Sequence, residues 1–217
     1  MWGVADMIPS KEEWIQALDD RHGIEFQKKI SSTTVAVCGL GGLGSNIAIS
    51  LARAGIGKLI LIDFDKVDIT NLHRQQYKAN QIGMCKTEAL QNNLKEINPY
   101  LETKIHTICL DESNAKDVLA DADIICEAFD NAEAKANIVN FVLSEMPNKY
   151  IVAASGMAGL DSANLIKTRK VSKRFYLCGD EVSDIKDGIG LVSTRVMLCA
   201  AHQAHTVLRI IAEEYEV

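Results

Sequence analysis

Four glycines in the first quarter of the sequence are spaced in a regular pattern. Residues 39–44, GLGGLG, fit G-x-G-x-x-G, follow the β-branched run TTVAVC and open a segment with helical spacing. Glycines at these positions permit a tight turn and let phosphate oxygens approach the backbone. The helix that follows offers unpaired N–H groups and a partial positive charge to an anion. The predicted phosphate-binding glycines are Gly39, Gly41, Gly42 and Gly44.

Charged and amide side chains follow the strands predicted after this pattern. Asp63 comes about 20 residues after Gly44, where a carboxylate can bind ribose hydroxyls. The loop beyond it offers Arg and Lys, which a triphosphate needs more than a pyrophosphate held by backbone amides does. Asp130 ends a later strand, and a carboxylate that faces phosphates suits Mg²⁺. The further candidates are Asp65, Asn71, Arg74, Gln75 and Lys86.

Strands and helices alternate along most of the chain. This alternation predicts an α/β, Rossmann-like, doubly wound and mostly parallel sheet. We expect a single domain over residues 1–217, with residues 1–30 as a polar helical extension whose N-cap is Ser10. One long helix is expected from about residue 189 to 215. The last two strands have no helix between them and should be antiparallel. The predicted strands are 33–39, 58–65, 103–110, 123–130, 150–155, 163–171 and 174–179.

The composition excludes several classes of protein. Of the 217 residues, 47% are hydrophobic and 24% are charged, as in globular rather than disordered proteins. The net charge of −6 gives no overall field for binding nucleic acid or membranes, so an anion must meet local cations. The uncharged run 31–52 is long enough to cross a bilayer, but it is better explained as strand, glycine loop and helix. The N-terminus lacks an export signal, so we expect a cytoplasmic protein.

Five stretches, spread over nearly the whole chain, carry a resemblance to a known family. They are GLGGLGSNIA, LILIDFDKVDITNLHRQQY, GMCK at 83–86, FDNAEAK and ASGMAG. The acidic strand end followed by N-L-x-R-Q is specific, whereas the glycine pattern alone is weak. Together they resemble the ubiquitin-activating-type adenylyltransferases, particularly the ThiF/MoeB branch. The short length and the stretches RHG, ASGMAG and AAHQAH look most similar to a compact ThiF subfamily assigned to thiamine biosynthesis.

The resemblance implies a reaction with ATP and Mg²⁺. The substrate would be the C-terminal Gly-Gly carboxylate of a small ubiquitin-like sulfur carrier protein (ThiS-like), which attacks the α-phosphorus and releases pyrophosphate. The adenylate would then receive sulfur from a donor protein. By the same resemblance, the ribose would be held by Asp63, the phosphates by Asn71, Arg74 and Lys86, and Mg²⁺ by Asp130.

Two more catalytic candidates come from the resemblance. Family members are homodimers, and Arg21 would match an N-terminal arginine that reaches the partner's triphosphate; the alternative is a helix-surface charge. Some relatives carry a nucleophilic cysteine, for which Cys178 in LCGD is the candidate here. In other relatives this place holds half of a zinc-binding pair. Because the sequence has no C-x-x-C, we expect no structural zinc, and no disulfide framework either.

The remaining cysteines are expected to be structural. Cys38, Cys109 and Cys126 lie within predicted buried strands and are interpreted as core residues. Cys199, His202 and His205 lie along one predicted helix. A metal site is conceivable there, but a packed or dimer-facing helix is the favoured account.

Other functions stay open on the sequence. An NAD-binding oxidoreductase is favoured only by the glycine pattern and Asp63. A binding module that keeps a nucleotide site, or an enzyme that activates a molybdopterin-type sulfur carrier or a tRNA base, would share more of the motifs. ATP–pyrophosphate exchange that depends on a Gly-Gly-ended carrier would separate these hypotheses.

Overall fold

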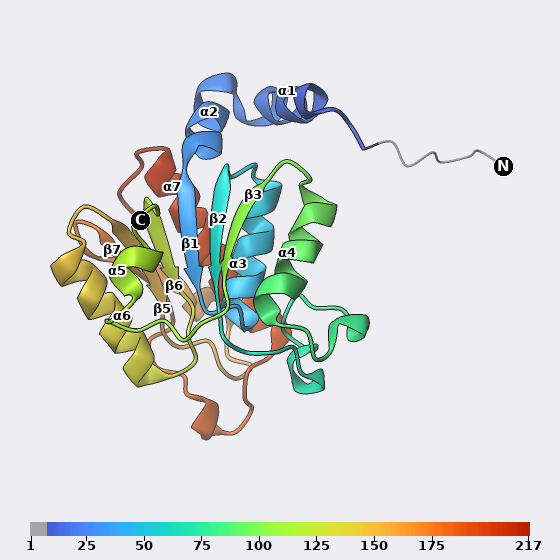
Figure 1. Ribbon diagram of the computed structural model, residues 1–217. Coiled ribbons are helices and arrows are strands. Elements are labelled where there is room, and N and C mark those ends of the chain that lie inside the picture. The colour runs from blue at the N-terminus through green and yellow to red at the C-terminus, as the bar shows by residue number, and fades with distance from the viewer. Residues whose placement is uncertain (1–7) are drawn as a thin grey trace.

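Seven strands form one sheet in the computed structural model, which describes residues 8–217 (Figure 1). Their order is β3-β2-β1-β4-β5-β7-β6, so β3 and β6 are the two edge strands. From β3 to β7 all neighbours are parallel, and β6 pairs with β7 in the antiparallel sense, as predicted. The strands are β1 Thr34–Cys38, β2 Lys58–Ile62, β3 Glu102–His106, β4 Ile124–Glu127, β5 Tyr150–Ala154, β6 Lys167–Ser172 and β7 Phe175–Gly179.

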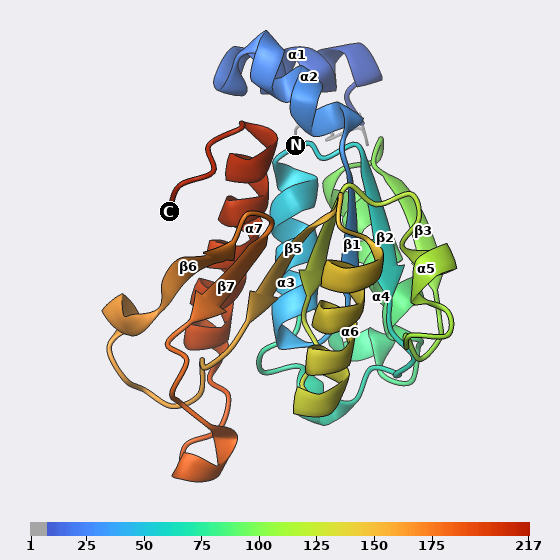
Figure 2. The ribbon, with the colours of Figure 1, turned by 90° about the vertical axis from the view of Figure 1, so that its left-hand side faces the viewer.

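Helices cover both faces of the sheet, which confirms the doubly wound α/β fold (Figure 2). Helices α3, α4 and α7 pack on one face, and α5 and α6 pack on the other. The described helices are α1 Lys11–His22, α2 Ile24–Ser32, α3 Gly42–Arg53, α4 Lys86–Ile97, α5 Ala115–Val118, α6 Ala132–Glu145 and α7 Ser193–Ile211.

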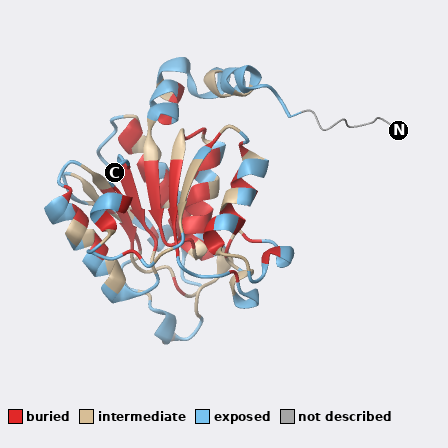
Figure 3. Ribbon diagram, in the orientation of Figure 1, coloured by how far each residue is buried: buried red, intermediate tan, exposed pale blue. Residues whose placement is uncertain are grey.

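Alternation along β1 builds two hydrophobic cores. Val35 and Val37 belong to the core beneath α3 and α7, whereas Ala36 and Cys38 belong to the core beneath α6. All four side chains are fully buried, and the centre of the sheet is buried on both sides (Figure 3). A strand covered on both faces needs an unbroken apolar run, which is why TVAVC reads as continuous rather than alternating.

The predicted extension is two helices that lie beyond the amino ends of the strands (Figure 1). Residues 1–7 of it lie outside the described part of the chain. Ser10 caps α1 as predicted: its hydroxyl accepts the N–H of Glu13, and the Glu13 carboxylate accepts the N–H of Ser10. Gly23 lies between α1 and α2 with φ +83°. Glycine adopts this angle at little cost, so the chain can leave one helix and start the next here.

Several predicted element ends differ from the structure: β2 stops at Ile62, β4 stops at Glu127 and β6 begins only at Lys167. The third strand stops at His106 instead of continuing to residue 110, so Cys109 lies in the following loop and is exposed. The assignment of Cys109 to a buried strand was therefore wrong, although Cys38 and Cys126 are buried as expected. The C-terminal helix is shorter than predicted, because it begins only at Ser193 and ends at Ile211.

Among residues 8–217, no helix is both long enough and apolar enough to span a bilayer. The uncharged run 31–52 contains the end of α2, all of β1, the glycine loop and most of α3, as predicted.

The chain reverses its direction of winding at the middle of the sheet. From β1 it adds β2 and β3 on one side, and it then returns to add β4 and β5 on the other. The carboxyl ends of β1 and β4 therefore flank a crevice. This switch point is the place where open α/β sheets bind ligands.

Candidate functional site

The glycine loop follows β1 at the switch point and is packed tightly against its surroundings. A Cβ on Gly39, which has φ +89°, would lie 2.8 Å from the carbonyl oxygen of Ala128 in the loop after β4. A Cβ on Gly44 would lie 1.8 Å from the carbonyl oxygen of Gly39. At Gly41, by contrast, the nearest heavy atom is Nε2 of Gln75 at 3.9 Å. The loop is thus closed on its inner side and open at Gly41.

Asp63 holds the glycine loop against the end of β2. Its Oδ2 accepts the N–H of Leu40 at 2.6 Å, and its Oδ1 accepts the N–H of Asp65 at 2.7 Å. The side chain is buried, so these bonds replace water for the carboxylate. Tyr77, which the sequence analysis missed, fixes the same loop by donating its hydroxyl to the carbonyl of Leu40 at 2.7 Å. Asp63 therefore lies where predicted, beside the glycines.

Lys86 is brought to the end of β2 by an ion pair with Asp65. The Nζ–Oδ2 distance is 2.7 Å, and the Lys86 side chain is only 7% exposed. The backbone reinforces the contact, because the N–H of Lys86 donates to the carbonyl of Asp65 at 2.9 Å. The first turn of α4 is thereby fixed beside the crevice. Two residues predicted from separate motifs are thus in direct contact.

Arg74 and Gln75 lie across the loop from the glycines. The Cδ of Arg74 is 3.5 Å from where a Cβ on Gly42 would lie. Within the described residues, Nε of Arg74 and Oε1 of Gln75 are buried and have no hydrogen-bond partner. Buried polar atoms are nearly always satisfied, so this pair fits a site that receives a polar ligand. Asn71 lies in the same turn, where its Oδ1 accepts the N–H of Asp68.

Asp130 is exposed and ends the loop that follows β4. The loop is fixed by Glu127, whose Oε1 accepts the N–H of Phe129 at 2.7 Å. Glu127 is fully buried and pairs with Lys135 of α6 at 2.6 Å. Burial raises the pKa of Glu127, and Lys135 acts in the opposite direction. The sequence analysis missed this pair, although a glutamate in the apolar run DIICEAF and a lysine in FDNAEAK were its signals.

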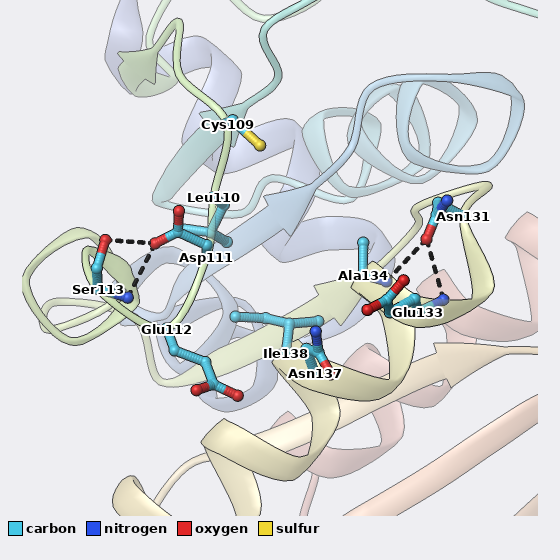
Figure 4. A pocket seen from close by; sticks show the side chains of 10 residues that line it. All are labelled: Cys109, Leu110, Asp111, Glu112, Ser113, Asn131, Glu133, Ala134, Asn137 and Ile138. Atoms are coloured by element: carbon cyan, nitrogen blue, oxygen red, sulfur yellow. Dashed lines mark hydrogen bonds between the residues drawn. The ribbon is translucent and has the colours of Figure 1, made fainter.

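A cavity of about 430 Å³ opens beside Asn131, between the loop after β3 and the first turn of α6 (Figure 4). The volume lies in the range of small-molecule sites. Asn131 caps α6 at the rim of the cavity, accepting the N–H groups of Glu133 and Ala134. The lining residues are Cys109, Leu110, Asp111, Glu112, Ser113, Asn131, Glu133, Ala134, Asn137 and Ile138.

Cys178 lies apart from this cluster, inside the packing between β7 and α7. Its thiol is fully buried, 3.6 Å from Oγ1 of Thr168 and 3.9 Å from Oγ1 of Thr206. Burial raises its pKa to about 11, which disfavours the thiolate that a nucleophile needs. Its catalytic role stays a prediction, and its environment counts against it.

Arg21 and the cysteine–histidine stretch also lie away from the glycine loop. Arg21 is in α1, beyond the amino ends of the strands, whereas the glycine loop is at the carboxyl ends (Figure 1). On α7, Cys199 is buried and its thiol donates to the carbonyl of Cys178 at 3.7 Å, while Nδ1 of His202 is 3.0 Å from Oγ1 of Thr168. Cys199 is therefore packed, which agrees with the favoured account of this helix.

The sheet order, the glycine loop at the switch point and the acidic strand end define a Rossmann-like α/β protein. Residues 16–217 match the ThiF family, so the chain belongs to that family. The resemblance inferred from the motifs is confirmed at this level. The thiamine-specific subfamily stays a prediction.

Curated relatives of this chain include longer proteins that are named adenylyltransferase and sulfurtransferase. The adenylyltransferase and sulfurtransferase MOCS3 of Caenorhabditis briggsae is 39% identical over 121 residues, covering 55% of this chain and 30% of that protein. The adenylyltransferase and sulfurtransferase UBA4 of Vanderwaltozyma polyspora is 27% identical over 209 residues, covering 91% of this chain and 46% of that protein. The chain thus spans less than half the length of these relatives.

Solved structures share the fold over nearly the whole chain. E. coli tRNA N6-threonylcarbamoyladenosine dehydratase, TcdA, in complex with ATP superimposes with a TM-score of 0.84 at 19% identity, covering 96% of this chain and 98% of that chain. E. coli MccB with succinimide gives a TM-score of 0.69 at 22% identity, covering 92% of this chain and 65% of that chain. At these identities the likeness concerns the fold alone.

Proposed function

We propose that this chain is an ATP-dependent adenylyltransferase that activates the C-terminal Gly-Gly carboxylate of a ubiquitin-like sulfur carrier, ThiS-like, for the thiazole of thiamine. The observation that carries the proposal is one cluster at the switch point. Asp63 binds the glycine loop and Lys86 binds Asp65. Among residues 8–217, Nε of Arg74 and Oε1 of Gln75 are buried and have no hydrogen-bond partner. ATP fits this donor set, because its phosphates accept from backbone N–H, Arg and Lys.

The chemistry needs little beyond positioning and charge. A terminal carboxyl group, with a pKa of about 3.5, is already ionised at neutral pH, so no general base is required. Its oxygen would attack the α-phosphorus and displace pyrophosphate. Arg74 and Lys86 would stabilise the negative charge on the phosphates, and the glycine loop would orient them. Asp130 would hold Mg²⁺, which supplies further charge neutralisation when bound.

The fit of the adenosine half is supported by the cavity beside Asn131. Its wall carries apolar side chains such as Leu110 and Ile138 together with Asn131, a mixture that suits a base. Asp63 is close to the glycine loop, where a ribose hydroxyl can share its carboxylate. MOCS3 and UBA4 are themselves named adenylyltransferases, which favours the same chemistry here.

ATP–pyrophosphate exchange with a purified carrier that ends in Gly-Gly tests the proposal. We expect exchange to require the carrier and Mg²⁺, and Arg74→Ala to lower it by about 100-fold or more, because phosphate charge is then unbalanced. Lys66→Ala, on the same loop and exposed, is the matched control and should leave the rate within about twofold. Tight NAD(H) binding without ATP binding would instead support an oxidoreductase.

A second candidate substrate is a carboxylate borne on a tRNA base. The observation that favours it is coverage: the structural match to the tRNA dehydratase spans nearly all of both chains, whereas the carrier-type relatives extend far beyond this one. The acyl activation would be the same. ATP consumption that depends on modified tRNA and not on a carrier would select this alternative.

A further inference from the structure

Two loops at the carboxyl edge of the sheet are bonded to one another. The β5 loop (residues 155–162) follows β5, and the β7 loop (residues 180–192) follows its parallel neighbour β7. The N–H of Asp180 donates to Gly156 at 2.9 Å, and the N–H of Gly159 donates to Gly190 at 3.0 Å. These two hydrogen bonds hold the β5 loop and the β7 loop side by side.

A buried ion pair joins the β7 loop to α7. Arg195, in the first turn of α7, pairs with Asp180, and the two side chains are only 4% and 2% exposed. The same guanidinium also donates to the carbonyl groups of Asp161 and Ser162. One side chain on a helix thus holds both loops. Because both charges are buried, loss of either partner leaves the other unbalanced.

Asp180 is held from the β7 loop as well. Its Oδ1 accepts the N–H of Val182 at 3.0 Å and the N–H of Ser183 at 2.9 Å. Burial alone would raise the pKa of Asp180, but these bonds and Arg195 lower it to about 2. Gly156 makes room for the carboxylate, because a Cβ there would lie 2.0 Å from Oδ1. The position of the Asp180 carboxylate is thus fixed by the N–H groups of the β7 loop, by Arg195 and by the close approach of Gly156.

The first turn of α7, which holds the two loops, contacts the glycine loop close to Arg74. Val196, next to Arg195, has Cγ1 2.9 Å from where a Cβ on Gly42 would lie, so the first turn of α7 touches the glycine loop. Lys86 follows β2, on the opposite side of β1 from β5 and β7. With the leaving pyrophosphate drawn toward Lys86 on the β2 side, an in-line nucleophile would enter from the side of the β5 and β7 loops.

We propose that Asp180 and Arg195 are positioning residues that preform the entry side for the carboxylate substrate and take no part in holding ATP. This inference rests on the proposed adenylation, but it does not depend on whether a protein tail or a tRNA base carries the carboxylate. The pair acts through the β5 and β7 loops.

Amide hydrogen exchange and ATP affinity of the full chain test the inference. We expect Arg195→Met to raise exchange in the β5 and β7 loops about tenfold or more, because the opening free energy of both loops falls, while exchange in β1 and β4 stays unchanged. The ATP dissociation constant, measured by calorimetry, should stay within about twofold. In ATP–pyrophosphate exchange with a Gly-Gly-ended carrier, KM for the carrier should rise about tenfold and KM for ATP should not.

Two further variants keep the test sharp. Arg195→Lys keeps the positive charge but loses the two separate N–H groups of the guanidinium that bond both loops. Compared with Arg195→Met, it should restore protection from exchange at residues 180–183 and not at 161–162. Arg169→Met is the matched control: Arg169 binds Glu181 of the same β7 loop by two hydrogen bonds, but on the surface. It should leave the β5 loop protected.

Three results would overturn the inference. They are unchanged loop exchange in Arg195→Met, a rise in exchange spread equally over β1 and β4, or a fall in ATP affinity that matches the loss of activity. Failure of the proposed function is a different outcome, because the unmodified chain would then bind no ATP while the loop comparison still stands.

Discussion

At the scale of single residues, the loop that presents Asp130 depends on one buried charge pair. Glu127 is fully buried at the end of β4, and Lys135 reaches it from α6 with a side chain that is 24% exposed. The carboxylate also accepts the N–H of Phe129, so it ties the loop after β4 to the helix that follows. Removing one partner of a buried pair costs more than the pair itself contributes, because a lone charge remains.

Lys135→Met should therefore destabilise the protein in a pH-dependent way. The pKa of Glu127 is raised in the folded state, so its contribution to stability is full below the unfolded pKa and falls as pH rises through the folded pKa. Loss of Lys135 raises that pKa further. We expect destabilisation of about 3 kcal/mol at pH 8 and about 1 kcal/mol at pH 5, measured by urea unfolding.

The matched background for this measurement is Glu127→Gln. In that background the carboxylate that faces Lys135 is gone, so Lys135→Met should have nearly the same effect at pH 5 and pH 8. An equal pH dependence in both backgrounds would assign the effect to another group.

At the scale of elements, a side chain of α7 bridges β4 and β5 where their pairing ends. The ladder between β4 and β5 ends at Cys126 and Val152, where the strands begin to separate. Gln203 of α7 is fully buried, and its Nε2 donates to the carbonyl groups of Glu127 at 3.0 Å and Val152 at 3.1 Å. A helix side chain thus satisfies two strands at the point where the crevice opens.

Gln203→Leu should weaken this junction without changing its volume much. It leaves buried carbonyl groups with one donor fewer, so we expect a loss of about 2 kcal/mol in the free energy of unfolding. Thr206→Val is a suitable control, because the Thr206 hydroxyl donates to the carbonyl of His202 at 2.7 Å and faces the Cys178 thiol, and it bonds neither of these strand carbonyl groups. Its cost should be about 1 kcal/mol or less. Equal effects would show that the strand carbonyl groups are not the cause.

At the scale of the whole molecule, the two ends of the sheet carry different candidate residues. The glycine loop, Asp63 and Lys86 are at the carboxyl ends, whereas Arg21 is on α1 beyond the amino ends (Figure 1). Arg21 of one copy cannot reach the glycine loop of the same copy across the length of the strands. If Arg21 contributes to catalysis, as the family resemblance implies, it does so in the site of a second copy.

Mixing two inactive variants tests this arrangement. If Arg21 acts across a dimer, Arg21→Ala and Arg74→Ala should each be inactive alone, and equal mixing with subunit exchange should restore about a quarter of the wild-type exchange activity. The restored sites are those that combine an intact Arg74 with the partner's intact arginine. Activity that stays at zero after proven subunit exchange, or full activity of Arg21→Ala alone, contradicts the arrangement.

Much of this fold could be predicted because its signals are local. The Ser10 cap, the glycine loop and the strand before Asp63 each depend on residues within a few positions of one another. The end of β3 was misplaced because residues 107–110 are as apolar as a strand, and only their turn toward α5 exposes Cys109. The contacts of Asp180 with Arg195 and of Gln203 with two strands join distant segments, and no local pattern announces them.

The two edge strands bear on how this protein behaves when concentrated. An open sheet leaves unpaired N–H and C=O groups along its edges, which can template aggregation. Here β6 carries Lys167, Arg169 and Lys170 within six residues, and β3 carries Glu102 and Lys104. Bringing such edges together would bury charges of like sign or strip them of water. The charged edges therefore disfavour endless strand-by-strand stacking, and they keep the open sheet from acting as the seed of a fibre.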